Sequence, residues 1–438
     1  MERKKFVDVT IPQLISTREQ TQGRWGNDPQ QEQSFRDLGF GMFIHWSLDC
    51  LLGSVISHWM IGAQTQLVDQ FISQMPKRFN PKYFDAEDYA ALAEQAGMKY
   101  MCFTAKHHNG FCMFDTRSTD FQIMNTPFKR DIFRELTEAF RSRGILPGVY
   151  FSPLDFYVNH RQGHTIHFLT PESLPVNNPQ LMEINRLQMR ELMERYGELH
   201  TVFFDGPPEG LKDIVWNTQP WCLITRGEME TPEGTLPDRI MDWAWEANYC
   251  LGDSWGYKPY RDALKTPREL IELLIQIRAM GGNLLLNVSP DALGQLPAKQ
   301  VEILREIGLF TFFNQEALYQ VRPWKVSHEG NIWFTKHKDT DTVYAFVLDD
   351  IWGVGYDYLN NQERWNDILL RQVKASENTQ IELVGQRGDA LEHHPELQPR
   401  CSFRQDEKGL HIHCLQSFRP YDNRKWPYPV AIRITHAR

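Results

Sequence analysis

Short apolar segments alternate with amphipathic segments from residue 39 to about residue 313. The apolar segments are rich in β-branched and aromatic residues, which is typical of buried strands. We expect strands over residues 39–47, 100–104, 145–152, 201–204, 222–225 and 284–288. The amphipathic segments carry apolar residues at helical spacing, and this predicts helices over residues 85–96, 131–143, 179–196, 267–279 and 298–313.

This regular alternation predicts one architecture in preference to another. Strands that are apolar on both faces and alternate with helices are typical of a parallel sheet, and the number of repeats favours a (β/α) barrel of the TIM type. A doubly wound sheet is the alternative, but no GxGxxG motif follows the first strand. The polar residues before Asp37 are expected to lie across the outside of the barrel.

The pattern changes near residue 320, where apolar and polar residues begin to alternate with a period of two. Residues 331–336 and 342–348 read as a hairpin, and the same period recurs at 380–384, 410–414 and 430–434. This predicts an all-β domain, in the form of a sandwich. The expected division is therefore a barrel over residues 1–320 and a β-sandwich over residues 321–438.

Composition excludes several classes of partner. A net charge of −9 without a basic cluster argues against nucleic acid and anionic membrane surfaces. No apolar run is long enough to cross a membrane, and no leader sequence is visible, so we expect a cytoplasmic protein, or a periplasmic or secreted one if a signal was removed. The seven cysteines are scattered and lack CxxC spacing, which indicates reduced thiols rather than disulfides or a zinc site.

Asp205 is the first candidate for chemistry. It ends the apolar run 201–204 and is followed by Gly206, Pro207 and Pro208, which cannot continue a strand. In a parallel barrel this end of the strand lies at the face where loops converge and catalysis takes place. An aspartate that merely caps a turn is the alternative interpretation.

Polar and aromatic side chains also lie near the carboxyl ends of other predicted strands. Some are in the strands themselves, and others are in the loops that follow. Several such groups at one face imply a polar pocket lined with rings and hydrogen-bond donors, which suits a neutral sugar. The residues are His45, Trp46, His107, His108, Tyr150, Arg226 and Trp255.

Two adjacent histidines raise the possibility of a metal. Neighbouring residues on a strand point to opposite faces, so His107 and His108 are poor joint ligands, and their spacing is not the i, i+4 spacing of a zinc helix. Hydrogen bonding to hydroxyl groups is the better interpretation. We expect no metal and no cofactor.

Glycoside hydrolysis with retention needs a second carboxylate that donates a proton. Glu246 follows Trp245 and precedes the aromatic turn 254–257, where aromatic neighbours would raise its pKa as an acid requires. Glu228, Glu230 and Glu233 are competitors in the polar stretch after Arg226. A solvated loop is the expected surrounding for at least two of these three.

Six motifs in order resemble glycoside hydrolase family 29, the α-L-fucosidases. They are GMFIHW at 41–46, KHHNGF at 106–111, GVYFS at 148–152, FFDG at 203–206, SWGY at 254–257 and GGNLLLNV at 281–288. The resemblance covers residues 36 to 325. It implies a TIM-type barrel followed by a β domain, and a retaining exo-glycosidase that releases terminal α-L-fucose from fucosylated oligosaccharides or glycoconjugates without a cofactor.

The same resemblance assigns roles to residues. It implies that Asp205 is the nucleophile and that Glu246 is the acid/base. His45, His107, His108, Tyr150 and Arg226 fall at positions similar to the family's sugar-binding residues. The resemblance says nothing of oligomeric state, linkage or aglycone.

Three positions depart from the family pattern. The family usually has Glu-Trp-Tyr after the first strand, where the Glu and Trp bind sugar hydroxyls, whereas this chain has His58-Trp59-Met60. We therefore expect His58 and Trp59 to bind substrate, and His58 raises the alternative of an α-L-galactosidase, because L-galactose is fucose with a hydroxyl on C6. Asn109 and Leu293 replace aspartates at positions that we interpret as structural.

Two other classes of protein remain open at this stage. A carbohydrate-binding protein without turnover would keep the aromatic pocket but would not need both carboxylates. A metal-dependent hydrolase would lose activity when its metal is chelated, whereas a glycosidase with two carboxylates would not.

Overall fold

The computed structural model describes residues 26–352, 365–386, 400–415 and 427–438. Its larger part is a seven-stranded parallel sheet with the strand order β5-β4-β3-β2-β1-β7-β6. The strands are β1 (Phe40–Ile44), β2 (Tyr100–Lys106), β3 (Leu146–Phe151), β4 (Thr201–Phe204), β5 (Leu223–Ile224), β6 (Glu246–Cys250) and β7 (Asn283–Val288). All six strands expected from the sequence in this region are present, and β6 was not expected.

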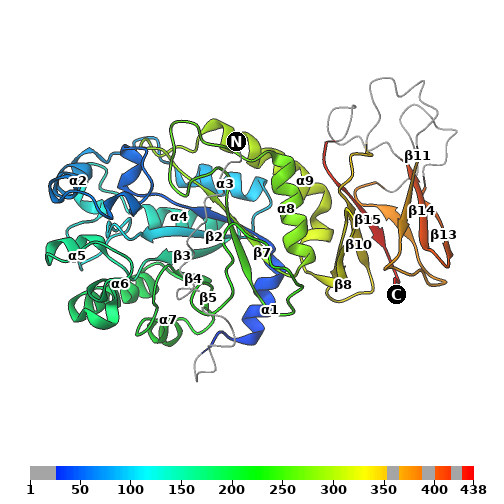
Figure 1. Ribbon diagram of the computed structural model, residues 1–438, viewed down its shortest axis with the longest axis horizontal. Coiled ribbons are helices and arrows are strands. Elements are labelled where there is room, and N and C mark those ends of the chain that lie inside the picture. Colours follow the sequence, from blue (N-terminus) through cyan, green and yellow to red (C-terminus); the bar gives the residue numbers. More distant parts are fainter. Residues whose placement is uncertain (1–25, 353–364, 387–399, 416–426) are drawn as a thin grey trace.

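Helices surround this sheet (Figure 1). They are α1 (Pro29–Leu38), α2 (Thr65–Arg78), α3 (Ala86–Gln95), α4 (Ile132–Ser142), α5 (Phe156–Arg161), α6 (Pro179–Arg195), α7 (Lys212–Thr218), α8 (Pro267–Ala279) and α9 (Ala298–Leu318). The five expected helices correspond to α3, α4, α6, α8 and α9. The end of the polar N-terminal segment forms α1, and residues 1–25 lie outside the described residues.

The sheet is curled, with β5 and β6 as its edge strands. Isolated parallel bridges pair Met229 with Arg226, Glu230 with Trp245 and Glu233 with Asn248. Residues 229–233 therefore lie between the end of β5 and β6 without forming a continuous strand. The parallel α/β architecture is confirmed, whereas a fully closed barrel is not seen in the described ranges.

The two faces of the strands have different surroundings because side chains alternate along a strand. Met42 and Ile44 of β1 belong to the large core beneath the helices. Phe43 points the other way, into a smaller cluster inside the curl that includes Tyr100, Tyr150 and Phe203. The inside of the curl is thus filled with rings, and its carboxyl-terminal end carries the polar groups described below.

The remaining strands form two antiparallel sheets, with the orders β12-β15-β10-β9-β8 and β11-β14-β13. They are β8 (Val321–Glu329), β9 (Ile332–His337), β10 (Val343–Val347), β11 (Trp365–Leu370), β12 (Ile381–Leu383), β13 (Ser402–Asp406), β14 (Gly409–Leu415) and β15 (Val430–Ile434). The expected period-two strands correspond to β9, β10, β12, β14 and β15. The boundary at residue 320 and the sandwich arrangement remain predictions.

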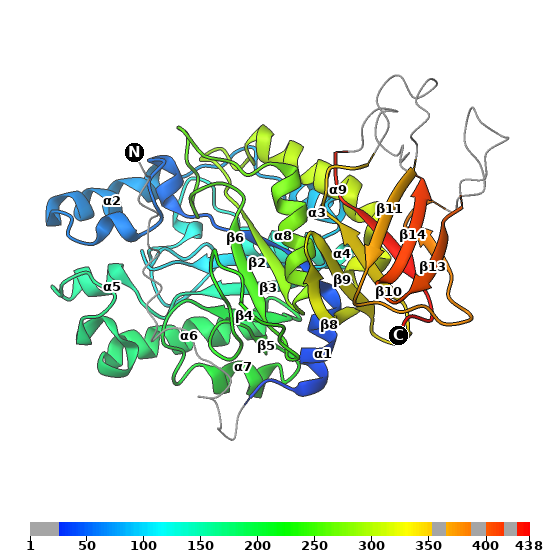
Figure 2. The ribbon, with the colours of Figure 1, turned by 45° about the vertical axis from the view of Figure 1, so that its right-hand side comes forward.

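Helices α8 and α9 lie between the parallel sheet and the antiparallel strands (Figures 1 and 2). Arg268 of α8 donates a hydrogen bond of 2.7 Å to the carbonyl of Leu348, after β10. Thr335 of β9 donates one of 2.9 Å to the carbonyl of Ala317 in α9. The two helices therefore contact strands on both sides.

The state of the cysteines and the hydropathy of the helices were both expected from composition. All seven cysteines are free, and five of them are buried. Within the described ranges, none of the helices is both long and apolar enough to cross a membrane.

Candidate active site

Polar side chains gather where the parallel strands end. His45 follows β1, His107 and His108 follow β2, and Asp205 follows β4. Arg226 lies two residues beyond β5. Because the carboxyl ends of parallel strands meet at one edge, these groups from four strands share one site.

Asp205 is contacted by three of the polar side chains of this site. Its Oδ2 accepts a hydrogen bond of 2.5 Å from the Tyr150 hydroxyl and lies 3.1 Å from Nε2 of His108. Its Oδ1 accepts a hydrogen bond of 3.1 Å from Nη1 of Arg226. Burial alone would raise the pKa of Asp205, but the contact with His108 and the charge of Arg226 outweigh burial and hold the pKa well below its usual range. The side chain keeps 19% exposure, so an ionised carboxylate faces the site.

Two further histidines are neutral, and hydrogen bonds fix the nitrogen that each presents. Burial lowers the pKa of His45 to about 3. The amide of Asn287 donates through Nδ2 to the carbonyl of Trp255, so its Oδ1 accepts from Nδ1 of His45 at 2.7 Å. Nε2 of His45 is therefore a hydrogen-bond acceptor.

His107 has the opposite tautomer. Its Nδ1 accepts the backbone N–H of His108 at 2.9 Å and also bonds Oγ of Ser57 at 2.8 Å. Burial, with the nearby charge of His108, holds the pKa of His107 well below its usual range, so its proton rests on Nε2. His107 thus offers a donor and His45 an acceptor, a combination that suits sugar hydroxyls.

His58 stands at the rim of the site, on the short 3-10 turn His58–Met60. Its Nδ1 donates to the carbonyl of Ile56 at 2.8 Å, and burial lowers its pKa. Nε2 is consequently an acceptor, as one oxygen of the family's usual glutamate would be. The His58 ring lies 6.0 Å from the ring of His108 and 5.2 Å from that of Phe168.

A buried network anchors this turn. Asp49, whose pKa burial raises to about 6, accepts hydrogen bonds from the indole N–H of Trp59 at 2.7 Å and from Nδ2 of Asn109 at 2.6 Å. Asn109 also donates to Ser47. Asn109 therefore has the structural role that the sequence predicted. The indole N–H of Trp59 is already occupied, and its ring packs 4.9 Å from Phe71 rather than on the residues around Asp205.

Rings form the wall of the site next to His45. Phe43 lies 4.3 Å from His45 and 5.2 Å from Phe203, between ring centroids. Trp255 lies 5.0 Å from His45. The predicted site residue Trp46 is not among these rings, because it packs against Phe79 and Phe84 in the core under the helices.

A second carboxylate is linked to Asp205 through Arg226. Nη2 of Arg226 donates to Oε2 of Glu233 at 2.7 Å, while Nη1 binds Asp205. Both carboxylates sit on one planar guanidinium, so their bonded oxygens can be no more than about 8 Å apart. Of the two other competitors, Glu228 is paired with Lys212 and Glu230 makes an isolated bridge with Trp245.

Glu246 lies elsewhere. It is the first residue of β6 and pairs with Asn283, the first residue of β7, whereas Asp205 follows the last residue of β4. Its carboxyl accepts a hydrogen bond of 2.8 Å from the hydroxyl of Tyr100, the first residue of β2. Burial raises the pKa of Glu246 to about 7. The structure therefore does not bring Glu246 to Asp205, because the two residues occupy opposite ends of the strands.

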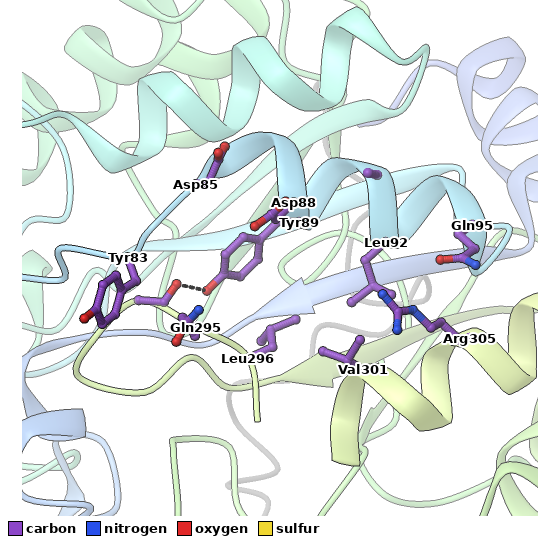
Figure 3. A pocket seen from close by; sticks show the side chains of 12 residues that line it. Tyr83, Asp85, Asp88, Tyr89, Leu92, Gln95, Gln295, Leu296, Val301 and Arg305 are labelled. Atoms are coloured by element: carbon purple, nitrogen blue, oxygen red, sulfur yellow. Dashed lines mark hydrogen bonds between the residues drawn. The ribbon is translucent and has the colours of Figure 1, made fainter. Parts of the chain in front are cut away.

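A metal-ligand cluster and a second hollow are two further features that bear on ligand binding. His107, His108 and Asp205 are of types that bind metals and offer atoms within 4.8 Å of one another. Within this cluster His108 and Asp205 already contact each other at 3.1 Å, and we assign no metal to it. A separate hollow of about 300 Å³ lies outside the sheet, between α3 and residues 294–296, and Figure 3 shows Tyr89 and Leu92 among its lining.

Several residues of the site were not expected from the sequence. Ser57, Ser152 and Asn287 bond the rings of His107, His108 and His45. Phe168 packs against His58 and His108 at the rim. None of these four residues stands in a pattern that singles it out. Ser152 and Asn287 do fall inside the motifs that carry the family resemblance. An inspection of every polar residue within those motifs would have found both.

Comparison with known proteins finds a family and relatives for this chain. The sequence model of the family described as alpha-L-fucosidase matches residues 11–316. The α-L-fucosidase of Dictyostelium discoideum is 28% identical over 363 residues, which are 72% of this chain and 77% of that protein. Human tissue α-L-fucosidase is 28% identical over 403 residues, which are 81% of each chain.

A solved structure shares the fold. It is an α-L-fucosidase of family 29 from Bacteroides thetaiotaomicron, with a TM-score of 0.73 and 22% sequence identity, and it covers 95% of this chain and 98% of that one. The family match spans the whole region in which the six motifs and the polar strand ends lie. The chain therefore belongs to the α-L-fucosidase family and is a glycoside hydrolase.

Proposed function

We propose that this protein is a retaining exo-glycosidase that releases terminal α-L-fucose, with Asp205 as the nucleophile. The observation that carries the proposal is the environment of Asp205, a carboxylate that Tyr150, His108 and Arg226 keep ionised at a strand end. The Bacteroides thetaiotaomicron enzyme was trapped as a covalent intermediate in a mutant in which a glutamate is replaced by glutamine. That finding supports a covalent step for a relative with the same fold.

Glu233 is the second carboxylate of this proposal, in place of Glu246. It shares the guanidinium of Arg226 with Asp205 and keeps 17% side-chain exposure, so it can meet a substrate oxygen. Retaining enzymes hold their two carboxylates roughly 5–5.5 Å apart. Glu246 has 1% exposure, and its carboxyl is bonded to Tyr100 at the other end of the strands, so it does not meet that oxygen.

The reaction proceeds in two steps. Oδ of Asp205 attacks the anomeric carbon while the glycosidic C–O bond breaks, and Glu233 gives its proton to the leaving oxygen. Glu233 then takes a proton from water, the water oxygen bonds to the anomeric carbon, and the bond to Asp205 breaks. Tyr150 and Arg226 hold the Asp205 carboxylate in place before attack and after its release.

The ring wall favours fucose over L-galactose. Phe43, Tyr150 and Trp255 surround His45 with apolar surface at ring distances of 4.3 to 5.3 Å. A C6 methyl group suits such a wall, whereas a C6 hydroxyl would lose its hydration there and find few partners. The α-L-galactosidase alternative rests on His58, whose ring lies 6.2 Å from that of His107 and which retains an acceptor nitrogen.

The proposal extends to architecture. The parallel sheet is a (β/α) barrel over residues 1–320 in which residues 229–233 occupy the place between β5 and β6, and the antiparallel sheets form a β-sandwich domain over residues 321–438. The isolated bridges at Met229, Glu230 and Glu233 support the closure. The change from parallel to antiparallel pairing after α9 supports the boundary.

The test compares aryl α-L-fucoside with aryl α-L-galactoside, with and without a chelator. We expect chelator-insensitive fucoside hydrolysis with retention, and near-complete loss in Asp205→Gly. Glu233→Ala should be rescued by azide on an activated fucoside, whereas Glu246→Gln serves as the matched control and should need no rescue. Turnover by Asp205→Gly close to that of the wild type would refute the proposal and favour the binding-protein class.

A further inference from the structure

The hydrogen bonds around His108 fix the positions of its protons. Oγ of Ser152 lies 2.9 Å from the carbonyl of Leu154 and 2.6 Å from Nδ1 of His108. A carbonyl can only accept, so the serine hydroxyl proton points to Leu154 and the serine oxygen accepts from the imidazole. Nδ1 of His108 therefore carries a proton.

The other ring nitrogen also carries one. Nε2 of His108 lies 3.1 Å from Oδ2 of Asp205. Two lone pairs facing each other at that distance would repel, so a proton lies between them. Asp205 already accepts from Tyr150 and Arg226, which stabilises its charged form, so this proton rests on the imidazole.

The groups around His108 are neutral or apolar rings, apart from the Ser152 hydroxyl and one carboxylate, so a positively charged His108 has one partner of opposite charge within the described ranges. The neutral ring of His107 lies 4.5 Å away, that of His58 6.0 Å away on the rim turn, and Phe156 of α5 and Phe168 complete the surroundings. Asp205 is the only carboxylate with which His108 makes a salt bridge among the residues that the structure describes. Burial, together with the positive charge of His108, lowers the pKa values of His107 and His58.

We propose that Ser152 is a positioning residue that keeps His108 doubly protonated, so that an imidazolium is paired with the nucleophile Asp205. This inference rests on the proposed function of Asp205. Ser152 is fully buried at the end of β3 and touches neither the carboxylate nor the open side of the site, so it acts only through His108. Serine is required because its hydroxyl can give its own proton to Leu154 while it accepts from the ring.

The cation has a consequence for both chemical steps. Before attack, it holds Asp205 in the ionised form that can act as a nucleophile. After attack, the carboxylate is an uncharged ester, and the imidazolium favours the step in which the ester bond breaks and the negative charge returns. Loss of the second proton should therefore slow release of the sugar from the enzyme more than its attachment.

Nitrogen NMR of the histidine rings tests the protonation state directly. In ¹⁵N-histidine-labelled wild-type protein at pH 7, we expect both His108 nitrogens to give signals of protonated nitrogen, assigned by their absence in His108→Gln. In Ser152→Ala the buried Nδ1–H has no acceptor, so the ring should become neutral. Ser173→Ala is the matched control, because Ser173 is equally buried but bonds Asn159 and Thr170 instead. A neutral His108 in the wild type would overturn the proposal, even if Ser152→Ala failed to fold.

The pH profile of kcat/KM separates a positioning role from a structural one. In Ser152→Ala we expect the acidic limb to move to higher pH and the basic limb to lower pH, by about one unit each, because the ion pair no longer stabilises either charged partner. A purely structural serine would lower stability and leave both limbs in place, and that result would refute the inference. Failure of the proposed function would be a separate result. Asp205→Asn would then turn over like the wild type, while the NMR spectrum of the wild-type protein would still show both His108 nitrogens protonated.

Discussion

Replacement of Glu246 by glutamine tests whether this buried carboxyl is part of the scaffold or of the chemistry. The pKa of Glu246 in the folded protein is raised from 4.5 to about 7 by burial, which the hydrogen bond from Tyr100 only partly offsets. A difference of this size corresponds to about 3 kcal/mol of differential stability between the protonated and ionised states.

The direction in which stability changes with pH follows from the two pKa values of Glu246, in the folded and in the unfolded chain. Below pH 4.5 the carboxyl is protonated in both the folded and the unfolded chain, and its titration has no effect on stability. Between pH 4.5 and pH 7 the unfolded chain ionises first, so stability falls as the pH rises, and above pH 7 the loss is complete. Glutamine does not ionise, so the stability of Glu246→Gln relative to wild type should rise by up to about 3 kcal/mol between pH 4.5 and pH 8.

The assay is urea denaturation of both proteins at pH 4.5, 6 and 8, followed by the midpoint. The same preparations are assayed on aryl α-L-fucoside, where we expect kcat to stay within a factor of about two, because a group at the other end of the strands cannot touch the substrate. A midpoint difference that does not change with pH would refute the burial argument. A fall in kcat of about a hundredfold or more would restore Glu246 to the role that the sequence predicted.

Three other changes have defined outcomes. Tyr150→Phe removes a donor to Asp205, so the acidic limb of the kcat/KM profile should move to higher pH and kcat/KM should fall about tenfold; an unmoved limb would contradict this. His58→Ala removes a hydrogen-bond acceptor, because burial lowers the pKa of His58 and keeps its ring neutral. KM for aryl fucoside should therefore rise by about tenfold at pH 7, with kcat little changed. A loss confined to kcat would speak against a binding role. Gly148→Ala would place a Cβ 2.9 Å from the carbonyl of Met101 and 3.0 Å from that of Thr201. We therefore expect the free energy of unfolding, measured by denaturation, to fall by ~2 kcal/mol or more. Wild-type stability would show that β3 and β4 can separate without cost.

Much of the fold was readable from the sequence because the strands are apolar and the helices have clear ends. The strand 201–204 and the helix 267–279 coincide with β4 and α8. The strand β6 was missed, because it follows a long polar stretch and begins with Glu246, a residue type that is depleted in strands. Its parallel pairing with β7, which begins at Asn283, makes it a strand.

The site was predictable in its residue types but not in its pairings. Asp205 and Arg226 were identified from strand ends, and the structure places them 3.1 Å apart. Glu233 and Glu246 could not be distinguished, because their difference depends on the end of the strands at which each one lies. Trp46 was expected in the site because it follows His45, yet successive residues point to opposite faces, and the structure places Trp46 in the core beneath the helices.

Helices α8 and α9 form a shared wall between the parallel and the antiparallel strands. A shared wall means that neither part has a complete surface of its own. If the chain were cut after residue 320, Phe310 of α9, which now packs against Phe346 of β10, would be open to water, and we expect the remaining part to become prone to self-association. The antiparallel sheets contribute no group to the active site among the described residues, and their contribution to the protein is to cover an apolar face of α9.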